Sequence, residues 1–373
     1  MVKKLKEIKN ESLNSTGETA LDMYRHTQGN SKKTRVVYFD ILNIIAMIAV
    51  VSMHCNGIVH NNPNTRAWNT SLIVDCVCYW AVPVFCMLSG ATLLNYRKKY
   101  DTKTFFKKRA QKVLIPFICW AIIMFIFKIC TNQLDVSNYT IRDYFNAFFN
   151  NYENGIYYFM FVILGIYLTI PLLSLVTKEE NNKILDLTII MYFIFNSFIP
   201  NILKLFKINY NNDFSIQIGP YIIFVLLGYI LSTRNISKKK RILIYVGAIV
   251  GLLYRYIITF IISKKSGTVY KEIWGYNSWH SILLASAVFI ANKYIFINKK
   301  ISLKVANILC NLSSCSFGIY LIHQLVMTFE KKVFYINTAS WEWRTIFVFI
   351  TYFVSLLIIY VMKKIPIIKK VVP

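Results

Sequence analysis

Runs of about 20 mainly apolar residues recur along the whole chain, and this repetition constrains the fold more than any other feature. A helix of about 20 residues crosses the hydrocarbon core of a bilayer, because each residue adds about 1.5 Å. Hydrophobic residues make up 56% of the 373 residues and charged residues only 16%. The sequence therefore predicts an all-α integral membrane protein, a bundle of about ten transmembrane helices.

The chain before the first apolar run is different in character. Residues 1–35 are polar and basic, which predicts a disordered cytoplasmic tail, followed by a membrane domain over 36–373. No cleavable signal peptide is expected, because the first apolar run is long enough to be a full span. The ten spans are predicted at 36–58, 72–94, 113–130, 156–177, 184–203, 218–232, 242–262, 277–297, 313–329 and 344–362.

The net charge of +26 could indicate a nucleic-acid-binding protein, but the basic residues are clustered in alternate loops. This is the pattern of a membrane protein whose cytoplasmic loops carry the excess of Lys and Arg. With the N-terminus inside, an even number of spans places both termini in the cytoplasm. We therefore expect contact with membrane lipid and no contact with nucleic acid. The basic segments are 1–35, 97–112, 234–241, 293–304 and 363–370.

The eight cysteines lie in or at the edges of apolar spans. Their spacing indicates neither a disulfide framework nor a metal site. We expect no metal and no tightly bound cofactor, and without a soluble domain of useful size the chemistry must lie within or beside the bundle.

The first span carries three polar residues, Asp40, Asn43 and His54. Polar groups inside a span are costly, so they usually face a protein interior or an aqueous cavity. At about 100° per residue the three side chains share one stripe, which is about 21 Å long. One helix thus offers a polar track across most of the membrane, with His54 at its outer end.

Two further residues could support His54. Asp75 is predicted near the outer start of the second span, where its carboxylate could orient the imidazole of His54 and stabilise its protonated form. His323 lies on one face of the ninth span with Ser316 and Tyr320. The alternative for Asp75 is an interfacial residue bonded to backbone or water, and the alternative for His323 is a packing residue.

Two groups of cations stand apart from the general charge pattern. Arg255 lies well inside the seventh span and needs an anionic partner, either a ligand phosphate or carboxylate or a neighbouring acidic side chain. On the cytoplasmic side, Lys108, Arg109 and Lys112 are placed to meet a polyanion such as a nucleotide-bearing donor.

Four stretches carry a family resemblance. They are YFDILNIIAMIAVVSMH (38–54), AVPVFCMLSGATLL (81–94), FFKKRAQKVLIPFICW (105–120) and SFGIYLIHQ (316–324). Together they make the chain resemble the acyltransferase 3 family of bacterial multi-pass membrane O-acyltransferases. That family often carries a fused soluble esterase-like domain, which this sequence, ending at Pro373, does not show.

The resemblance implies roles for individual residues. His54 occupies the position of the family's proposed catalytic histidine. Its support by Asp75 or His323 is an expectation from helix geometry and not from the resemblance. Asn43 stands where the family commonly has Arg, so donor binding is expected to rest more on Arg35, Lys108 and Arg109. From geometry rather than from the resemblance, Ser89, Tyr320 or a freed backbone N–H could stabilise the oxyanion.

The function implied is transfer of an acyl group, acetyl in particular, from cytosolic acyl-CoA to a hydroxyl of a surface polysaccharide or its lipid-linked precursor, in a bacterial plasma membrane. The main alternative is a transporter or flippase of a lipid-linked glycan, in which Arg255 grips a phosphate. A sensory or scaffold protein is a third possibility. The sequence does not predict the oligomeric state.

Overall fold

The computed structural model describes residues 36–150, 155–211, 213–366 and 368–372. The predicted tail 1–35, which includes Arg35, lies outside this part. The helices are α3 (Val37–Cys55), α4 (Arg66–Cys78), α5 (Ala81–Leu93), α6 (Thr102–Arg109), α7 (Ile115–Cys130), α8 (Ile141–Phe149), α9 (Tyr158–Val176), α10 (Asn182–Tyr192), α11 (Ile199–Leu205), α12 (Ile222–Thr233), α13 (Lys238–Ser266), α14 (Trp279–Phe296), α15 (Leu303–Phe334) and α16 (Trp341–Met362).

These helices confirm the predicted class, an all-α multi-pass membrane protein. Within the described residues, nine helical segments are long and apolar enough to cross a membrane. The predicted sixth span corresponds to α12, an apolar helix of only 12 residues. At about 1.5 Å per residue it is about 18 Å long, too short to span the hydrocarbon core alone.

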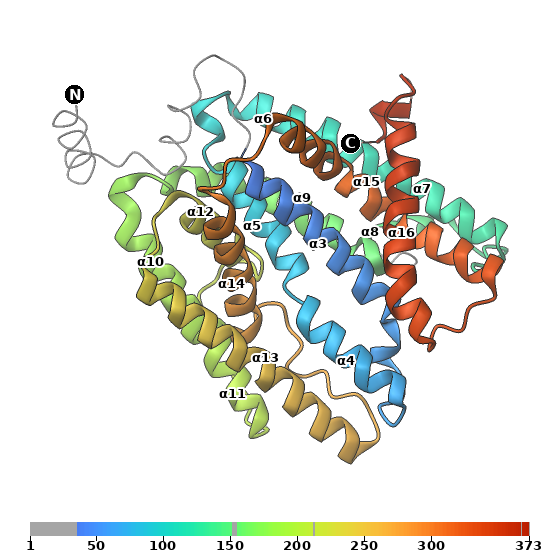
Figure 1. Ribbon diagram of the computed structural model, residues 1–373, viewed down its shortest axis with the longest axis horizontal. Coiled ribbons are helices and arrows are strands. Elements are labelled where there is room, and N and C mark those ends of the chain that lie inside the picture. Colours follow the sequence, from blue (N-terminus) through green and yellow to red (C-terminus); the bar gives the residue numbers. More distant parts are fainter. Residues whose placement is uncertain (1–35, 151–154, 212, 367, 373) are drawn as a thin grey trace.

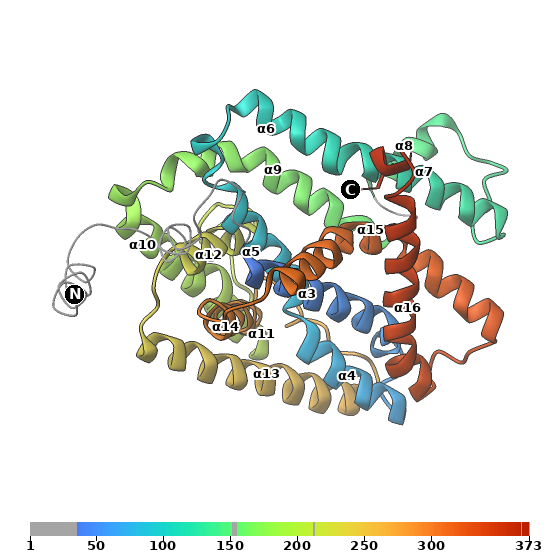
Figure 2. The ribbon, with the colours of Figure 1, turned by 45° about the horizontal axis from the view of Figure 1, so that its top comes forward.

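Helix α3 lies at the centre of the bundle, where it packs against α4, α5, α14, α15 and α16 (Figure 1). Apolar side chains on α7, α13 and α16 are exposed instead, as expected for helices that face lipid. In Figure 2, α13 runs along one edge of the molecule and α16 crosses another, with α3 between them. The polar residues of α3 are thus enclosed by other helices.

The second predicted span is broken into two helices. Helix α4 ends at Cys78 and α5 begins at Ala81, with turn residues Tyr79 and Trp80 between them. Pro83 has no N–H to donate to the carbonyl four residues earlier, so the hydrogen-bond ladder is interrupted at this point. The second span is therefore a non-uniform helix.

Helices α5 and α12 pack with their backbones in close contact. A Cβ atom added to Gly90 would lie 1.9 Å from the carbonyl oxygen of Val225, and one added to Gly228 would lie 1.9 Å from that of Met87. Small residues allow such an approach between helices in membranes. The close packing at Gly90 and Gly228 fixes one wall of the interior.

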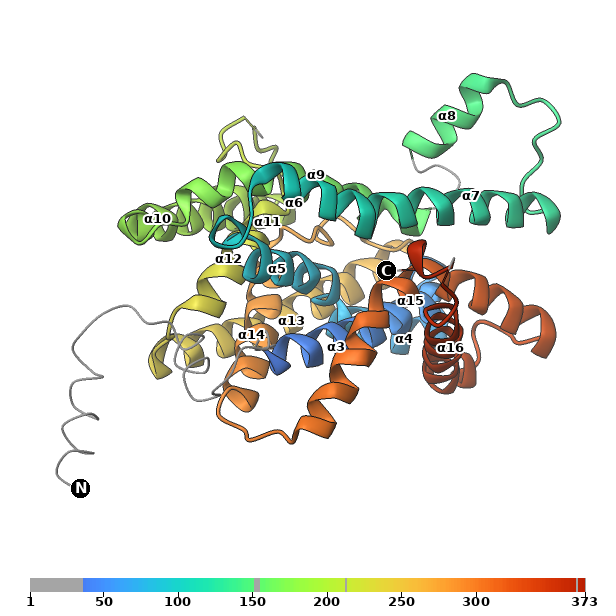
Figure 3. The same cartoon turned by 90° about the horizontal axis from the view of Figure 1, so that it is seen from above.

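Helix α8 was not predicted. It lies in the loop 131–155 and stands apart from the bundle beyond α7 (Figure 3). Thr140 and Asp143 form a reciprocal capping box at its start. Ile141, Phe145 and Phe149 recur at intervals of four and are exposed, so the helix has one apolar face.

Candidate active site

A cavity of about 1530 Å³ opens between α3, α5, α9, α12 and α15. One end of it, which we call the basic end, lies where α3 begins and α5 and α12 end. Among the described residues that line it, six are cationic and only Asp40 is acidic, so the cavity favours an anionic ligand. The six cations are Arg97, Lys98, Lys99, Arg109, Lys178 and Arg234.

Two of these arginines are held by neighbouring helices. Arg97 donates from Nε to Ser174 Oγ at 2.8 Å. Arg234 donates to Asp186 Oδ1 at 2.6 Å and to Asn182 Oδ1 at 2.7 Å. Each guanidinium has five N–H groups, so donors remain for a ligand. Fixed positions reduce the entropy lost when a ligand binds.

Of the predicted donor-binding residues, Arg109 lines the cavity and Lys108 does not. The Arg109 guanidinium lies 5.5 Å from the Tyr167 ring centroid, and its buried Nε has no hydrogen-bond partner among the described residues. Lys108 Nζ instead lies 3.8 Å from the Tyr100 ring centroid. A π-helical segment, Ala110–Leu114, follows Arg109 directly, and such segments are frequent at functional sites.

The inner part of the cavity is lined by Asn43, Ser89, Ser316 and Tyr320. Two of the expected oxyanion donors are already engaged. Ser89 Oγ donates to the Phe85 carbonyl at 3.1 Å, and the Tyr320 hydroxyl donates to the Ile156 carbonyl. Either would have to release its present acceptor before it could donate to a reaction intermediate.

Asn43 sets the alignment of α3 with α15. Its Nδ2 donates to both the carbonyl and the hydroxyl of Ser313, each at 2.9 Å. His54 follows Asn43 by 11 residues and His323 follows Ser313 by 10 residues, so both lie about 15–17 Å further along the two helices. The two imidazoles therefore meet, with ring centroids 5.1 Å apart.

Hydrogen bonds to the backbone define the state of the second histidine. His323 Nδ1 lies 2.7 Å from the Tyr320 carbonyl oxygen, which can only accept, so Nδ1 carries the proton. The buried Nε2 has no hydrogen-bond partner within the described part of the chain. In the neutral ring this nitrogen holds a lone pair and can accept a proton or a hydrogen bond.

From the sequence, Asp75 was expected to contact His54, but in the structure Asp75 has a different partner. Asp75 Oδ2 instead accepts from Arg255 Nη2 at 2.5 Å, and the side chains are only 8% and 2% exposed. A buried guanidinium needs a counter-charge, and α4, which packs against α13, supplies it. The sequence left three possible partners for Arg255: a ligand phosphate, a ligand carboxylate or a neighbouring acidic side chain. In the structure the partner is a neighbouring acidic side chain.

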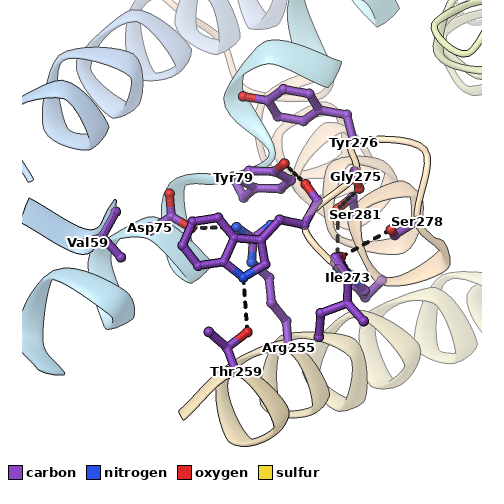
Figure 4. Close-up of polar contacts among 12 residues, drawn as sticks. Val59, Asp75, Tyr79, Arg255, Thr259, Ile273, Gly275, Tyr276, Ser278 and Ser281 are labelled. Atoms are coloured by element: carbon purple, nitrogen blue, oxygen red, sulfur yellow. Dashed lines mark hydrogen bonds and ion pairs between the residues drawn. The ribbon is translucent and has the colours of Figure 1, made fainter. Parts of the chain in front are cut away.

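Aromatic residues enclose this ion pair, as Figure 4 shows. The guanidinium carbon of Arg255 lies 3.3 Å from the Tyr79 ring centroid and 5.1 Å from that of Trp274. The Tyr79 hydroxyl donates to the Trp274 carbonyl, and Trp274 Nε1 donates to Thr259 at 3.0 Å. The ion pair thus joins α4 and α13 to the loop before α14.

One buried acid was missed in the sequence. Glu330 accepts from the Thr351 hydroxyl at 2.5 Å, and its other carboxyl oxygen has no partner among the described residues. It follows His323 by seven residues, which places both on one face of α15. That spacing could have revealed it, but the predicted ninth span ended at residue 329, whereas α15 continues to Phe334.

Comparison with known proteins gives one match. The family model for the acyltransferase domain of the acyltransferase 3 family matches residues 36–360. No curated protein matches the chain, and no solved structure does. The family match covers nearly the whole described chain, from the start of α3 into α16. The chain therefore belongs to the acyltransferase 3 family of membrane acyltransferases.

Proposed function

We propose that this protein is an O-acyltransferase of the bacterial plasma membrane. It would move an acyl group from cytosolic acyl-CoA to a hydroxyl of a surface glycan or of its lipid-linked precursor. One observation carries the proposal: a large cavity, with six cations among its described lining residues, leads inward toward the pair of His54 and His323.

The cavity suits the donor in charge and size. A CoA thioester carries several phosphate charges at one end and an uncharged acyl thioester at the other. Phosphates are favoured at the basic end, which Arg97 and Arg234 line, and the thioester is favoured further in. The volume of about 1530 Å³ exceeds that of a typical small-ligand pocket, as a long donor requires.

The chemistry requires a base beside the reacting hydroxyl. The His54 ring is only partly buried and contacts the His323 ring. In the proposed step, His54 removes the hydroxyl proton while the oxygen attacks the thioester carbonyl. The carbon–sulfur bond then breaks, and the imidazolium returns the proton to the leaving CoA thiolate. His323, through its free Nε2, would orient His54 or share the proton.

The transporter alternative rested on Arg255 as a grip for a phosphate. Because the Asp75 carboxylate already neutralises Arg255, the observation that favoured transport has another explanation. Acyl transfer accounts for the cavity and for the histidine pair, and we therefore retain it as the proposed function.

The test is mass spectrometry of base-labile acyl esters on surface glycans. Cells would carry the wild-type chain, no chain, His54→Ala, His323→Ala or the control variant His60→Ala, with glycan amount and membrane level of the protein measured alongside. We expect esters to be lost without the chain and with His54→Ala, and retained with His60→Ala, at normal glycan export. Unchanged esters with less surface glycan would contradict acyl transfer and favour transport.

A further inference from the structure

Three aromatic side chains form the inner limit of the cavity. Phe85 of α5, Phe159 of α9 and Tyr320 of α15 are, on their respective helices, the lining residues farthest from the basic end. Their rings are in contact: the centroids are 5.9 Å apart for Phe85 and Phe159, and 5.8 Å apart for Phe159 and Tyr320. We call these three residues the aromatic limit.

The aromatic limit lies between the cavity and the histidines. The Tyr320 ring centroid is 5.9 Å from that of His323, which in turn is 5.1 Å from that of His54. Neither histidine is among the residues that line the cavity. An acyl group that enters from the basic end must therefore pass these rings before its carbonyl reaches His54.

Two of the three rings are held in place. The Tyr320 hydroxyl donates to the Ile156 carbonyl, and the Tyr157 hydroxyl donates to the Leu321 carbonyl at 2.7 Å, so α15 is fixed to the start of α9 twice. Phe159 is buried, whereas Phe85 is only half-buried. Phe159 and Tyr320 are therefore held more firmly than Phe85, which has the most freedom to move.

We propose that the aromatic limit selects the acyl group by length and restricts the donor to short acyl chains such as acetyl. This inference rests on the proposed function. An added methylene must displace a packed ring or leave the thioester carbonyl short of His54. A pocket that fits one chain length discriminates against one extra methylene by about 10-fold or more.

The experiment uses inverted membrane vesicles from cells that contain the full chain and its glycan acceptor. Acetyl-, butyryl- and hexanoyl-CoA are supplied separately at the cytoplasmic face, and the base-labile esters formed are measured by mass spectrometry. The variants are Phe159→Ala and Phe85→Ala. Phe39→Ala is the matched control, because Phe39 lines the same cavity on α3, closer to the basic end.

We expect the wild-type chain to transfer acetyl at least about 10-fold faster than butyryl. Phe159→Ala should lower this ratio about 10-fold, with a smaller change for Phe85→Ala and none for Phe39→Ala. A ratio of two donors in one preparation does not depend on how much protein folds. If Phe159→Ala does not reach the membrane, Phe159→Leu makes the same test with less loss of packing.

Two results would overturn the inference: a wild-type chain that transfers hexanoyl as fast as acetyl, or equal changes of the ratio in Phe159→Ala and Phe39→Ala. Failure of the proposed function would look different, because wild-type vesicles would then form no ester from any of the three donors.

Discussion

The ion pair between Asp75 and Arg255 offers the sharpest test of what Arg255 does. Asp75→Asn would remove the negative charge and leave the guanidinium buried, with the carbonyl of the new amide and the Tyr79 ring as its neighbours. Arg255→Met would leave the carboxyl group instead. The double variant Asp75→Leu with Arg255→Met would remove both charges and keep the site apolar.

The structure gives the expected magnitudes. The two groups are in contact at 2.5 Å with almost no exposure to solvent, and breaking such a buried pair costs about 3–5 kcal/mol. Arginine cannot lose its proton to escape this cost, whereas a carboxyl group can become neutral by binding one. Asp75→Asn should therefore destabilise the protein more than Arg255→Met. The double variant should lose less stability than either single variant.

The free energy of unfolding of each variant would be measured in detergent, together with acyl-ester formation in cells. We expect the double variant to recover both stability and ester formation relative to the single variants. A double variant that folds as well as the wild type but forms no ester would refute this reasoning, because Arg255 would then act on a ligand rather than only on Asp75. A loss below about 1 kcal/mol in Asp75→Asn would also contradict it, since that is the range of exposed pairs.

Three further variants test the packing around the cavity. Gly90→Ala should lower the yield of folded protein and its thermal unfolding temperature, because the new methyl group would overlap the backbone of α12; Gly165→Ala, which meets open space, is the control and should leave both unchanged. Lys293→Met should cost at least about 1–3 kcal/mol in thermal unfolding, because the buried ammonium donates to three backbone carbonyls at the end of α12; a change below about 0.5 kcal/mol would show that the carbonyls find other donors. Asn43→Leu should lower kcat more than it changes the affinity for CoA measured by calorimetry, because α3 would lose its alignment with α15 and His54 its position; an equal loss of CoA binding would instead assign Asn43 to the donor site.

The sequence predicts which segments are helices far better than where each helix ends. Apolar runs reveal the spans, because lipid requires them. The ends are less clear, since polar residues such as Lys293 and Glu330 can still be buried when another helix supplies a partner. Lys293 and Glu330 both lie within long helices, yet the exposed fraction of each residue is 3% or less. The partners come from other helices and leave no local signal.

The site is predicted in part, for a similar reason. His323 was one of two candidates, with Asp75, for the support of His54, and the structure brings the rings of His54 and His323 into contact. The partner of Asp75 was not predicted, because Arg255 follows it by 180 residues. Each residue alone indicates only that a counter-charge is needed, and the packing of α4 against α13 decides which one is used.

The cations of the basic end show why topology and ligand binding are hard to separate in a sequence. Both require Lys and Arg at the same end of the bundle, one to orient the chain in the membrane and the other to attract a polyanion. Helix phase separates the two uses: Arg109 lines the cavity while the adjacent Lys108 lies over an aromatic ring. The π-helical segment Ala110–Leu114 adds a residue to the turn after Arg109, so it changes the phase of Lys112 relative to Lys108 and Arg109. Regular α-helical spacing therefore cannot place Lys112 relative to the other two cations.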